Sequence, residues 1–283
     1  MNSIIKGLYL VSTPIGNLND ITIRAIEILK KSDIILCEDT RHSIKLLNYL
    51  KIKKKIFSYH KFNEKKQLSK VIGYLKEGKI LSIISDAGTP TLSDPGNLLV
   101  NECIKNKINI FPIPGPSAIT AAMSVSGFDQ QFIFIGFLPK TENELEKTLK
   151  GLTNLNYSLV FFISGVKINF YLKAFKKFFF DRKIMIAREI SKLHETLYRD
   201  SVESINLFTT SLKGELTVVI SKKLIKSNKV SNDTKSNLKK QAILYLKKYS
   251  LKDVVELISK KEKVAKNKIY KLCLEIKKDE KIS

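Results

Sequence analysis

The sequence predicts an α/β protein built from two α/β domains, followed by a small C-terminal helical module that resembles a helix-turn-helix. Three observations support this fold class. Short apolar runs alternate with longer amphipathic segments, a proline-rich segment interrupts the alternation near residue 112, and a polar stretch precedes the last three amphipathic segments. At 283 residues the chain is long enough to bury two modest cores.

The first domain is expected over residues 1–112. Its apolar runs predict strands at 7–11, 34–37, 55–58 and 80–84, and amphipathic segments predict helices at 20–31, 41–50 and 64–77. Strands that alternate with helices favour a mostly parallel sheet that is covered on both faces.

The segment FPIPGP, residues 111–116, has three prolines and one glycine in six positions. No helix or central strand accommodates this composition, so we predict a rigid connector and a domain boundary there. The second domain, 113–225, then has a small-residue helix at 117–126. Its strands are expected at 132–136, 157–163, 184–188, 194–199 and 216–220. The run at 182–200 predicts an antiparallel hairpin, which would make the second sheet mixed.

Residues 226–237 are polar and predict a linker. The module at 238–283 is expected to hold helices at 238–248, 251–261 and 265–277, with Ser250 and Asp253 as a capping box. Its small core is predicted from eight apolar residues: Val254, Val255, Leu257, Ile258, Val264, Ile269, Leu272 and Ile276. A nucleic-acid-binding module and a dimer strut or docking element both fit this pattern.

The formal charge of +23 is compatible with an anionic partner such as RNA. It is supporting evidence only, because 45 of the 50 basic residues are Lys, and such a bias is typical of AT-rich genomes. The three cysteines are far apart and form no CxxC pair, so we expect a reducing, cytoplasmic setting with no disulfide and no metal site. No apolar run approaches the roughly 18 residues of a membrane span, and no signal peptide is recognisable.

Three loops rich in proline and glycine follow predicted strands or the domain junction: VSTPIGN (11–17), SDAGTPTLSDPG (85–96) and PGPSAIT (114–120). In an open α/β sheet, ligands bind outside the carboxyl ends of the strands. Glycines allow the backbone to approach a ligand, and prolines hold a loop in shape before the ligand arrives. One such loop would suggest only a tight turn, whereas three favour a ligand cleft.

Seven blocks in order carry a family resemblance: VSTPIGNLNDITIRA, CEDTRHS, SDAGTPTLSDPG, PIPGPSA, GFLPK, REISKLHET and KGELTVVI. With these blocks the chain resembles the tetrapyrrole methylase superfamily and, within it, the enzymes that methylate the ribose 2′-hydroxyl of a cytidine in 16S rRNA. The resemblance implies S-adenosylmethionine (SAM) in the cleft between the two α/β domains, 16S rRNA or the 30S subunit as partner, and a homodimer. The first turn, STPIGN, lacks the GxGxxG pattern of a Rossmann methyltransferase, so SAM must be held differently.

SAM requires oxygen atoms near its sulfonium, donors for its carboxylate and an apolar slot for adenine. We expect Ser12, Thr13 and Pro14 to border the slot, and Asp86, Ala87 and Gly88 to offer backbone and carboxylate contacts. Ser117 and Thr120, at a helix start, suit an anion. The family resemblance adds Ala187, Gly214, Glu215 and Leu216. For Asp86, a role in a turn or as a helix cap remains open.

A ribose hydroxyl is a poor nucleophile and needs a proton acceptor. The candidates for that acceptor are His60 and Glu195. For RNA contacts we predict six residues: Arg41, His60, Lys61, Asn63, Arg188 and Lys192. Arginine in a lysine-rich chain suggests bidentate bonding, either to phosphate or to an internal carboxylate. Structural roles remain open for three of these side chains: Arg41 paired with Glu38 or Asp39, His60 packed beside Tyr59, and His194 facing solvent from a strand.

One block departs from the family pattern. Where the family has Glu-Ser/Ala-Pro-His-Arg, this chain reads FFISGVKINF, which places Ile163, Val166 and Lys167 at the acidic, His and Arg positions. Two other functions therefore stay open: a tetrapyrrole or precorrin C-methyltransferase, and a non-catalytic RNA-binding assembly protein.

Overall fold

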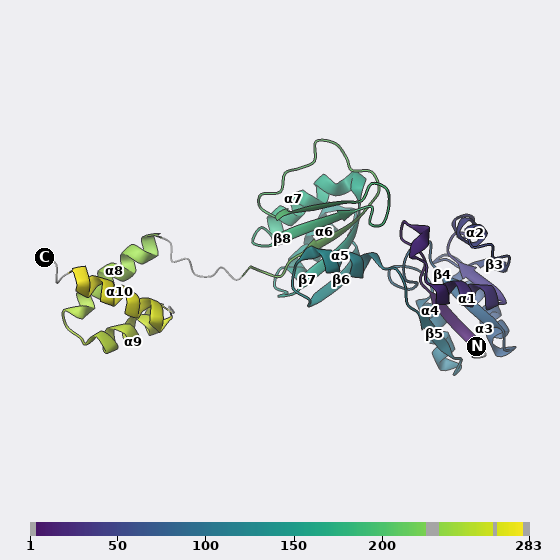
Figure 1. Cartoon of the computed structure of the whole chain (residues 1–283), viewed down its shortest axis with the longest axis horizontal. Coiled ribbons are helices and arrows are strands. Elements are labelled where there is room, and N and C mark those ends of the chain that lie inside the picture. The colour runs from purple at the N-terminus through teal and green to yellow at the C-terminus, as the bar shows by residue number, and fades with distance from the viewer. Residues whose placement is uncertain (1–3, 225–231, 263–264, 280–283) are drawn as a thin grey trace. The chain divides into compact units, whose positions relative to one another are not determined.

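The first sheet has five parallel strands in the order β3-β2-β4-β1-β5 (Figure 1). This computed structural model describes residues 4–224, 232–262 and 265–279. The strands are β1 (Gly7–Val11), β2 (Ile34–Cys37), β3 (Lys55–Ser58), β4 (Ile80–Ile84) and β5 (Ile110–Ile113). The four strands expected in the first domain are confirmed, and so is the parallel arrangement.

Helices cover both faces of this sheet. On one face α1 (Ile23–Lys31) and α2 (Thr40–Tyr49) pack through Leu29 and Leu47, and on the other α3 (Glu64–Lys76) and α4 (Asn97–Lys105) pack through Leu75 and Leu99. The helix predicted from residue 20 begins instead at Ile23, because the Thr22 hydroxyl accepts a hydrogen bond from the Ala25 N–H at 3.1 Å and so caps the helix. A single 3-10 turn, Leu18–Asp20, precedes it.

The proline-rich segment is partly a strand, which corrects the expectation of a simple connector. Phe111 and Pro112 lie in β5, and Pro112 is in register with Leu10 of β1. β5 is at the edge of the sheet, where a residue without an N–H is tolerated because its outer side has no strand to bond. The strand continues to Ile113, one residue past the predicted boundary.

The second sheet is mixed, as predicted, with the order β6-β7-β10-β8-β9. Only the β6–β7 pair is parallel, and β8 and β9 form the expected antiparallel hairpin. The strands are β6 (Phe132–Phe137), β7 (Ser158–Ser164), β8 (Lys183–Arg188), β9 (Thr196–Ser201) and β10 (Glu215–Ile220). Because β9 begins at Thr196, His194 lies in the preceding loop, and the prediction of a strand from residue 194 was wrong at that end.

Three helices cover the second sheet. The helix α5 (Ala118–Ser126) packs on one face through Ile119 and Ala122. On the other face α6 (Glu142–Leu152) and α7 (Ile168–Phe178) contribute Leu149 and Phe175 to the largest apolar cluster. A 3-10 turn, Gly165–Lys167, leads from β7 into α7.

A buried arginine holds the far end of this sheet together. The Arg182 side chain is fully buried and donates hydrogen bonds to the carbonyls of Thr153 (2.9 Å), Leu155 (2.8 Å), Tyr157 (3.3 Å) and Ser221 (3.3 Å). Its guanidinium also lies over a phenylalanine ring, that of Phe179. This arginine therefore serves the structure by satisfying carbonyls that would otherwise be buried without a donor.

The chain divides into two compact units, Met1–Leu224 and Ile225–Ser283. The second unit contains α8 (Asn232–Leu246), α9 (Leu251–Glu262) and α10 (Lys266–Asp279), which share a small apolar core. Residues 232–237 are helical, which corrects that part of the predicted linker, and 226–231 lie outside the described residues.

Most of the predicted core of the helical unit is buried, but Leu257 is exposed, which corrects that assignment, and Val264 lies outside the described residues. Ser250 caps α9, because its hydroxyl oxygen accepts from the Asp253 N–H at 3.3 Å and its hydroxyl donates to the Asp253 carboxylate at 2.6 Å. This differs from a full capping box, in which the carboxylate would accept from the Ser250 backbone.

Within the described ranges, no helix has the length and apolar character that crossing a membrane requires. Cys37, Cys103 and Cys273 are buried free thiols. The same residues contain no cluster of three or more His, Cys, Asp or Glu placed to hold a metal ion.

We expect Arg182→Met to lower the free energy of unfolding by about 3 kcal/mol, because four buried carbonyls lose their donor. Urea unfolding measures this. Arg24→Met is the matched control, since Arg24 is exposed and donates to one carbonyl, that of Pro112. Equal stability losses in the two variants would contradict the role of Arg182.

Candidate active site

The three proline- and glycine-rich loops meet at the carboxyl ends of three neighbouring strands, β4, β1 and β5. Thr13 and Gly88 form an isolated antiparallel bridge with N–H···O distances of 2.9 and 3.0 Å. The Ser12 hydroxyl donates to Thr89 Oγ1 at 3.2 Å. Gly115 lies so close to Ser12 that a Cβ on the glycine would come within 2.9 Å of the Ser12 Cβ. The loops therefore support one another.

A cavity of about 950 Å³ opens beside these loops, at the large end of the range for small-molecule sites. Apolar side chains, including Ile119, Leu138 and Phe162, form much of its wall. The residues of the atypical block, Ile163, Val166 and Lys167, also line it. The departure from the family pattern thus lies at the cavity itself.

The structure places seven of the twelve predicted cofactor residues in the cavity wall: Asp86, Ala87, Gly88, Ser117, Gly214, Glu215 and Leu216. The other five are not among the lining residues: Ser12, Thr13, Pro14, Thr120 and Ala187. Thr13 instead donates its hydroxyl to the Ser85 carbonyl at 3.1 Å, and Thr120 donates to the Ser117 carbonyl at 3.2 Å. Ala187 is buried beneath α5.

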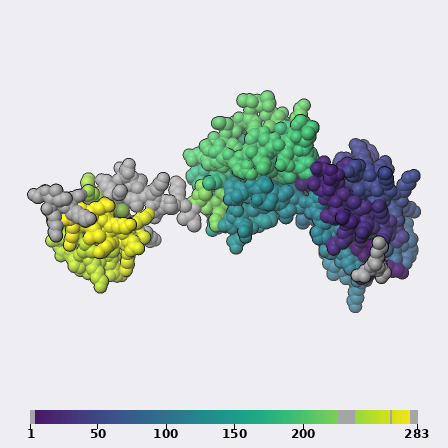
Figure 2. All heavy atoms as spheres, viewed as in Figure 1, coloured from purple at the N-terminus to yellow at the C-terminus, as the bar shows by residue number. Residues whose placement is uncertain are grey.

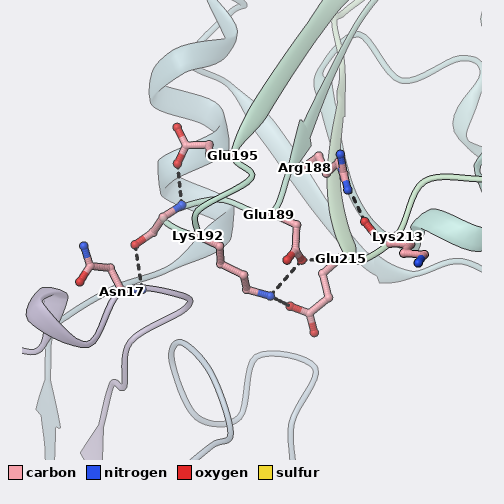
Figure 3. Close-up of polar contacts among 8 residues, drawn as sticks. Asn17, Arg188, Glu189, Lys192, Glu195, Lys213 and Glu215 are labelled. Carbon is pink, nitrogen blue, oxygen red and sulfur yellow. Dashed lines mark hydrogen bonds and ion pairs between the residues drawn. The ribbon is translucent and has the colours of Figure 1, made fainter.

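Lys192 joins two carboxylates in the cavity wall, as Figure 3 shows. Its ammonium lies 3.0 Å from Glu189 Oε1 and 3.1 Å from Glu215 Oε2. Burial lowers the pKa of Lys192, but its bonds to the two carboxylates outweigh this and raise it. Burial raises the pKa of Glu189, and hydrogen bonds from the Glu215 N–H and Lys192 bring it below its ordinary value. We call these three residues the lysine–carboxylate cluster.

Gly214 makes room for this cluster. Its φ is +96°, and a Cβ there would collide with the Glu189 carboxylate. Only glycine satisfies both conditions without strain. The sequence resemblance that selected Gly214 thus has a steric basis.

The loop after β1 contacts the loop between β8 and β9. The Asn17 N–H donates to Ser191 Oγ at 3.2 Å, and the Ser191 hydroxyl donates to the Asp20 carboxylate (Figure 3). Gly16 faces the Lys192 stem so closely that a Cβ would collide with it. Figure 2 shows the purple N-terminal residues against the teal and green surface of the second sheet's domain. This contact closes one side of the cavity.

A group of carboxylates lies at the ends of β2 and β4. Asp86 lines the cavity and accepts a hydrogen bond from the Asp39 N–H at 3.2 Å, so it has both the expected position and a structural bond. Asp94 also lines the cavity. Burial, followed by the negative charge of Glu38, raises the pKa of Asp94 to about 6. Burial and the charge of Asp86 likewise raise the pKa of Glu38.

Sequence reasoning missed Asp94. The signal was present, since Asp94 is the second aspartate of the loop that leaves buried strand β4. Thr91 and Ser93 nearby have φ values of 72° and 73°, which are uncommon for residues other than glycine. The sequence did not reveal this backbone conformation.

The predicted RNA-binding residues, apart from Lys192, are not among the lining residues. Arg41 donates to both carboxylate oxygens of Asp39, at 3.1 and 2.6 Å, and its side chain is 88% exposed. Hydrogen bonds from the Arg41 side chain and N–H lower the pKa of Asp39 to about 2. Asp39 is also the N-cap of α2, so the ion pair and helix cap considered from sequence are both present. Arg188 donates to the Lys213 carbonyl at 2.9 Å.

The other candidates lie in two loops. In the loop before α3, Asn63 accepts from the His60 N–H at 2.9 Å and donates to the Ser58 carbonyl, and His60 Nδ1 accepts from the Phe62 N–H at 3.2 Å. Lys61 is exposed beside them. In the second loop, Glu195 accepts from the Ser191 N–H at 2.6 Å, a local bond that fixes the loop (Figure 3).

The two sheets, the loops at the ends of the parallel strands and the cavity beside them define a two-domain α/β ligand-binding protein. The model of the tetrapyrrole (corrin/porphyrin) methylases matches residues 7–206, and the chain belongs to this family.

The chain is similar over most of its length to proteins named ribosomal RNA small subunit methyltransferase I. It is 46% identical to the one from Thermotoga maritima, over 76% of this chain and 98% of that protein. The values are 42%, 81% and 98% for Mesomycoplasma conjunctivae, and 35%, 97% and 99% for Pasteurella multocida.

Solved structures support the fold. The methyltransferase CobJ has a TM-score of 0.57 at 14% identity, covering 76% of this chain and 94% of that chain. The uroporphyrin-III C-methyltransferase of Thermus thermophilus complexed with S-adenosyl homocysteine has a TM-score of 0.52 at 13% identity, covering 76% and 97%.

Asp94 provides a test of the cavity electrostatics. A carboxyl whose folded-state pKa is raised stabilises the fold at a pH below its unfolded pKa, and that contribution is lost as the pH rises toward 6. Asp94→Asn does not ionise, so we expect it to gain melting temperature relative to the unsubstituted protein between pH 4 and pH 7. Thermal unfolding across that range measures the difference. A difference that is independent of pH would contradict the raised pKa.

Proposed function

We propose that this protein transfers the methyl group of SAM to the 2′-hydroxyl of a cytidine ribose in 16S rRNA, at the decoding centre of the small subunit. The observation that carries the proposal is the 35–46% identity to proteins named ribosomal RNA small subunit methyltransferase I, together with a cavity at the family's ligand-binding edge. The cytidine and the 2′ position come from the resemblance of the sequence blocks.

The cavity residues fit SAM chemically. Ile119, Leu138 and Phe162 offer an apolar wall for adenine. The helix α5 begins beside the cavity, and its N-cap, Ser117, makes no side-chain cap bond, so the first N–H groups and this hydroxyl suit a carboxylate. SAM supplies an activated methyl group on a cationic sulfur. The chain's part is to position the two reactants and to accept a proton.

The loop before α3 fits an RNA strand. Phe62 is 93% exposed at its tip, and Lys61, Lys65 and Lys66 are exposed around it. Bonds made by His60 and Asn63 hold the loop in shape, so Phe62 is presented without a large ordering cost. Exposed aromatic rings stack on unpaired bases, and lysines neutralise phosphates. The roles of Arg41, Arg188 and Lys192 toward RNA remain part of this proposal.

This loop lies next to the cavity loop. Glu64, the first residue of α3, accepts a hydrogen bond from the N–H of Gly96 at 3.4 Å. An RNA strand stacked on Phe62 would therefore pass close to the carboxyl ends of β2 and β4. The proposal needs this proximity.

Methylation of a small tetrapyrrole is the second candidate, and the fold of uroporphyrin-III and cobalamin enzymes favours it. Those structures are 12–16% identical to this chain, far below the named rRNA methyltransferases. A non-catalytic role in assembly would leave the cavity without a use.

We further propose a homodimer acting in the cytoplasm, where ribosomal RNA is found, with the Lys-rich helical unit adding affinity for rRNA. The 219 residues aligned with the Thermotoga protein make up 98% of it, so about a quarter of this chain has no counterpart there. The helical unit is thus expected to assist the reaction rather than to perform it. Sedimentation equilibrium tests the dimer.

Purified protein incubated with methyl-labelled SAM and 30S subunits from cells lacking the modification tests the function. We expect one methyl group per 16S rRNA, recovered as 2′-O-methylcytidine after nuclease digestion. Label on uroporphyrinogen or a precorrin, with none on rRNA, would establish the second candidate. No transfer to either class of substrate would contradict a methyltransferase function.

Phe62→Ala is expected to weaken binding of the 30S subunit or of a 16S rRNA fragment about tenfold, because one base loses its stacking partner. Its SAM affinity is expected to stay unchanged, and Phe62→Tyr should keep the RNA affinity. Filter binding and calorimetry measure the two affinities. Leu193→Ala is the matched control, since Leu193 is equally exposed but aliphatic. Unaltered RNA binding by Phe62→Ala would contradict a stacking role.

A further inference from the structure

Four carboxylates line the cavity, and three of them are engaged. Glu189 and Glu215 share the ammonium of Lys192. Asp86 accepts the N–H of Asp39. Among the described residues, Asp94 makes no ion pair and bonds to a hydroxyl, that of Ser85. A carboxylate tied to an ammonium is a weak base, so Asp94 is the one placed to take a proton.

The loop around Asp94 is held firmly. Gly96, with φ +120°, leaves no room for a Cβ, which would lie 2.8 Å from Ile83 Cδ1 and 3.2 Å from Thr91 Cγ2. Ser93 contacts the second sheet, because a Cβ on Gly136 of β6 would come within 3.0 Å of Ser93 Oγ. Asp94 therefore lies where the first sheet's loops meet the second sheet, which is also where the cavity is.

We propose that Asp94 is the proton acceptor for the ribose 2′-hydroxyl in the methyl transfer. This rests on the proposed function. The 2′-oxygen forms a bond to the methyl carbon, the bond from that carbon to sulfur breaks with its electrons staying on sulfur, and the 2′-hydroxyl proton passes to a carboxylate oxygen of Asp94. The proton then leaves to water, and the products are a 2′-O-methyl ribose and S-adenosylhomocysteine.

This assignment replaces the two acceptors proposed from sequence as the better placed group. His60 and Glu195 are not among the residues lining the cavity. Glu195 is also engaged by the Ser191 N–H, and His60 Nδ1 by the Phe62 N–H.

The charged surroundings of Asp94 determine its response to pH. Glu38 at the end of β2 and Asp86 after β4 disfavour its ionisation, with Ser85 opposing them. Glu64 of α3 bonds to Gly96 in the same loop, and His60 acts on Glu38. The other charged residues of the cavity wall are Lys140, Lys167, Lys192, Glu189 and Glu215. Since the pKa of Asp94 is raised to about 6, the carboxylate is both present and basic near neutral pH.

The test compares the unsubstituted protein with Asp94→Asn and Asp94→Glu in single-turnover methylation of 30S subunits from pH 5 to pH 9. The unsubstituted rate is expected to rise with pH around a midpoint near 6 and to level off above 7. We expect Asp94→Asn to be slower by at least about 100-fold and to lack this rise, with Asp94→Glu intermediate. SAM affinity by calorimetry should change less than threefold in both variants. Glu27→Gln, an exposed carboxylate on α1, is the matched control.

Three results would overturn the proposal. Asp94→Asn could methylate within threefold of the unsubstituted protein, its loss could come wholly from weaker SAM or RNA binding, or it could keep the same pH dependence. In each case the unsubstituted protein is active, so the proposed function stands. An unsubstituted protein that transfers no methyl to rRNA overturns the proposed function and the role of Asp94 together. Thermal unfolding of each variant confirms that it is folded.

Discussion

The site depends on one short backbone contact, the bridge between Thr13 and Gly88. Two hydrogen bonds, of 2.9 and 3.0 Å, join the loops after β1 and β4. The φ of +83° at Gly88 gives the second loop the turn that the bridge needs. With the bridge in place, the third loop packs through Gly115 against Ser12. Polar cavity groups on three strands are thereby fixed before any ligand arrives, which lowers the ordering cost of binding.

The cavity keeps its negative charges in two different states. In the lysine–carboxylate cluster, Lys192 neutralises charge and keeps Glu189 ionised. At the ends of β2 and β4, Asp94 and Glu38 have raised pKa values because burial and neighbouring carboxylates act together. A sulfonium donor is a cation and the nucleophile must lose a proton. A site with both fixed negative charge and a basic carboxylate suits that pair of requirements.

The sequence was informative where local rules decide the structure. Alternating apolar runs located the four strands expected in the first sheet, and the loop composition identified the ligand edge, because glycine and proline act through the local backbone. It failed where the outcome depends on neighbours. Pro112 entered a strand because β5 is an edge, Leu257 faces solvent, and Lys192 lies between two carboxylates. Asp94 could not be distinguished from Asp86, since only the folded contacts show which carboxylate is engaged.

Hydrogen–deuterium exchange with and without S-adenosylhomocysteine tests most directly whether the three joined loops form the cofactor site. Bound product should protect amides in residues 86–96, 117–120 and 214–217, with little change in β3 or in α9. Protection confined to other segments, or no protection at saturating product, would contradict the account.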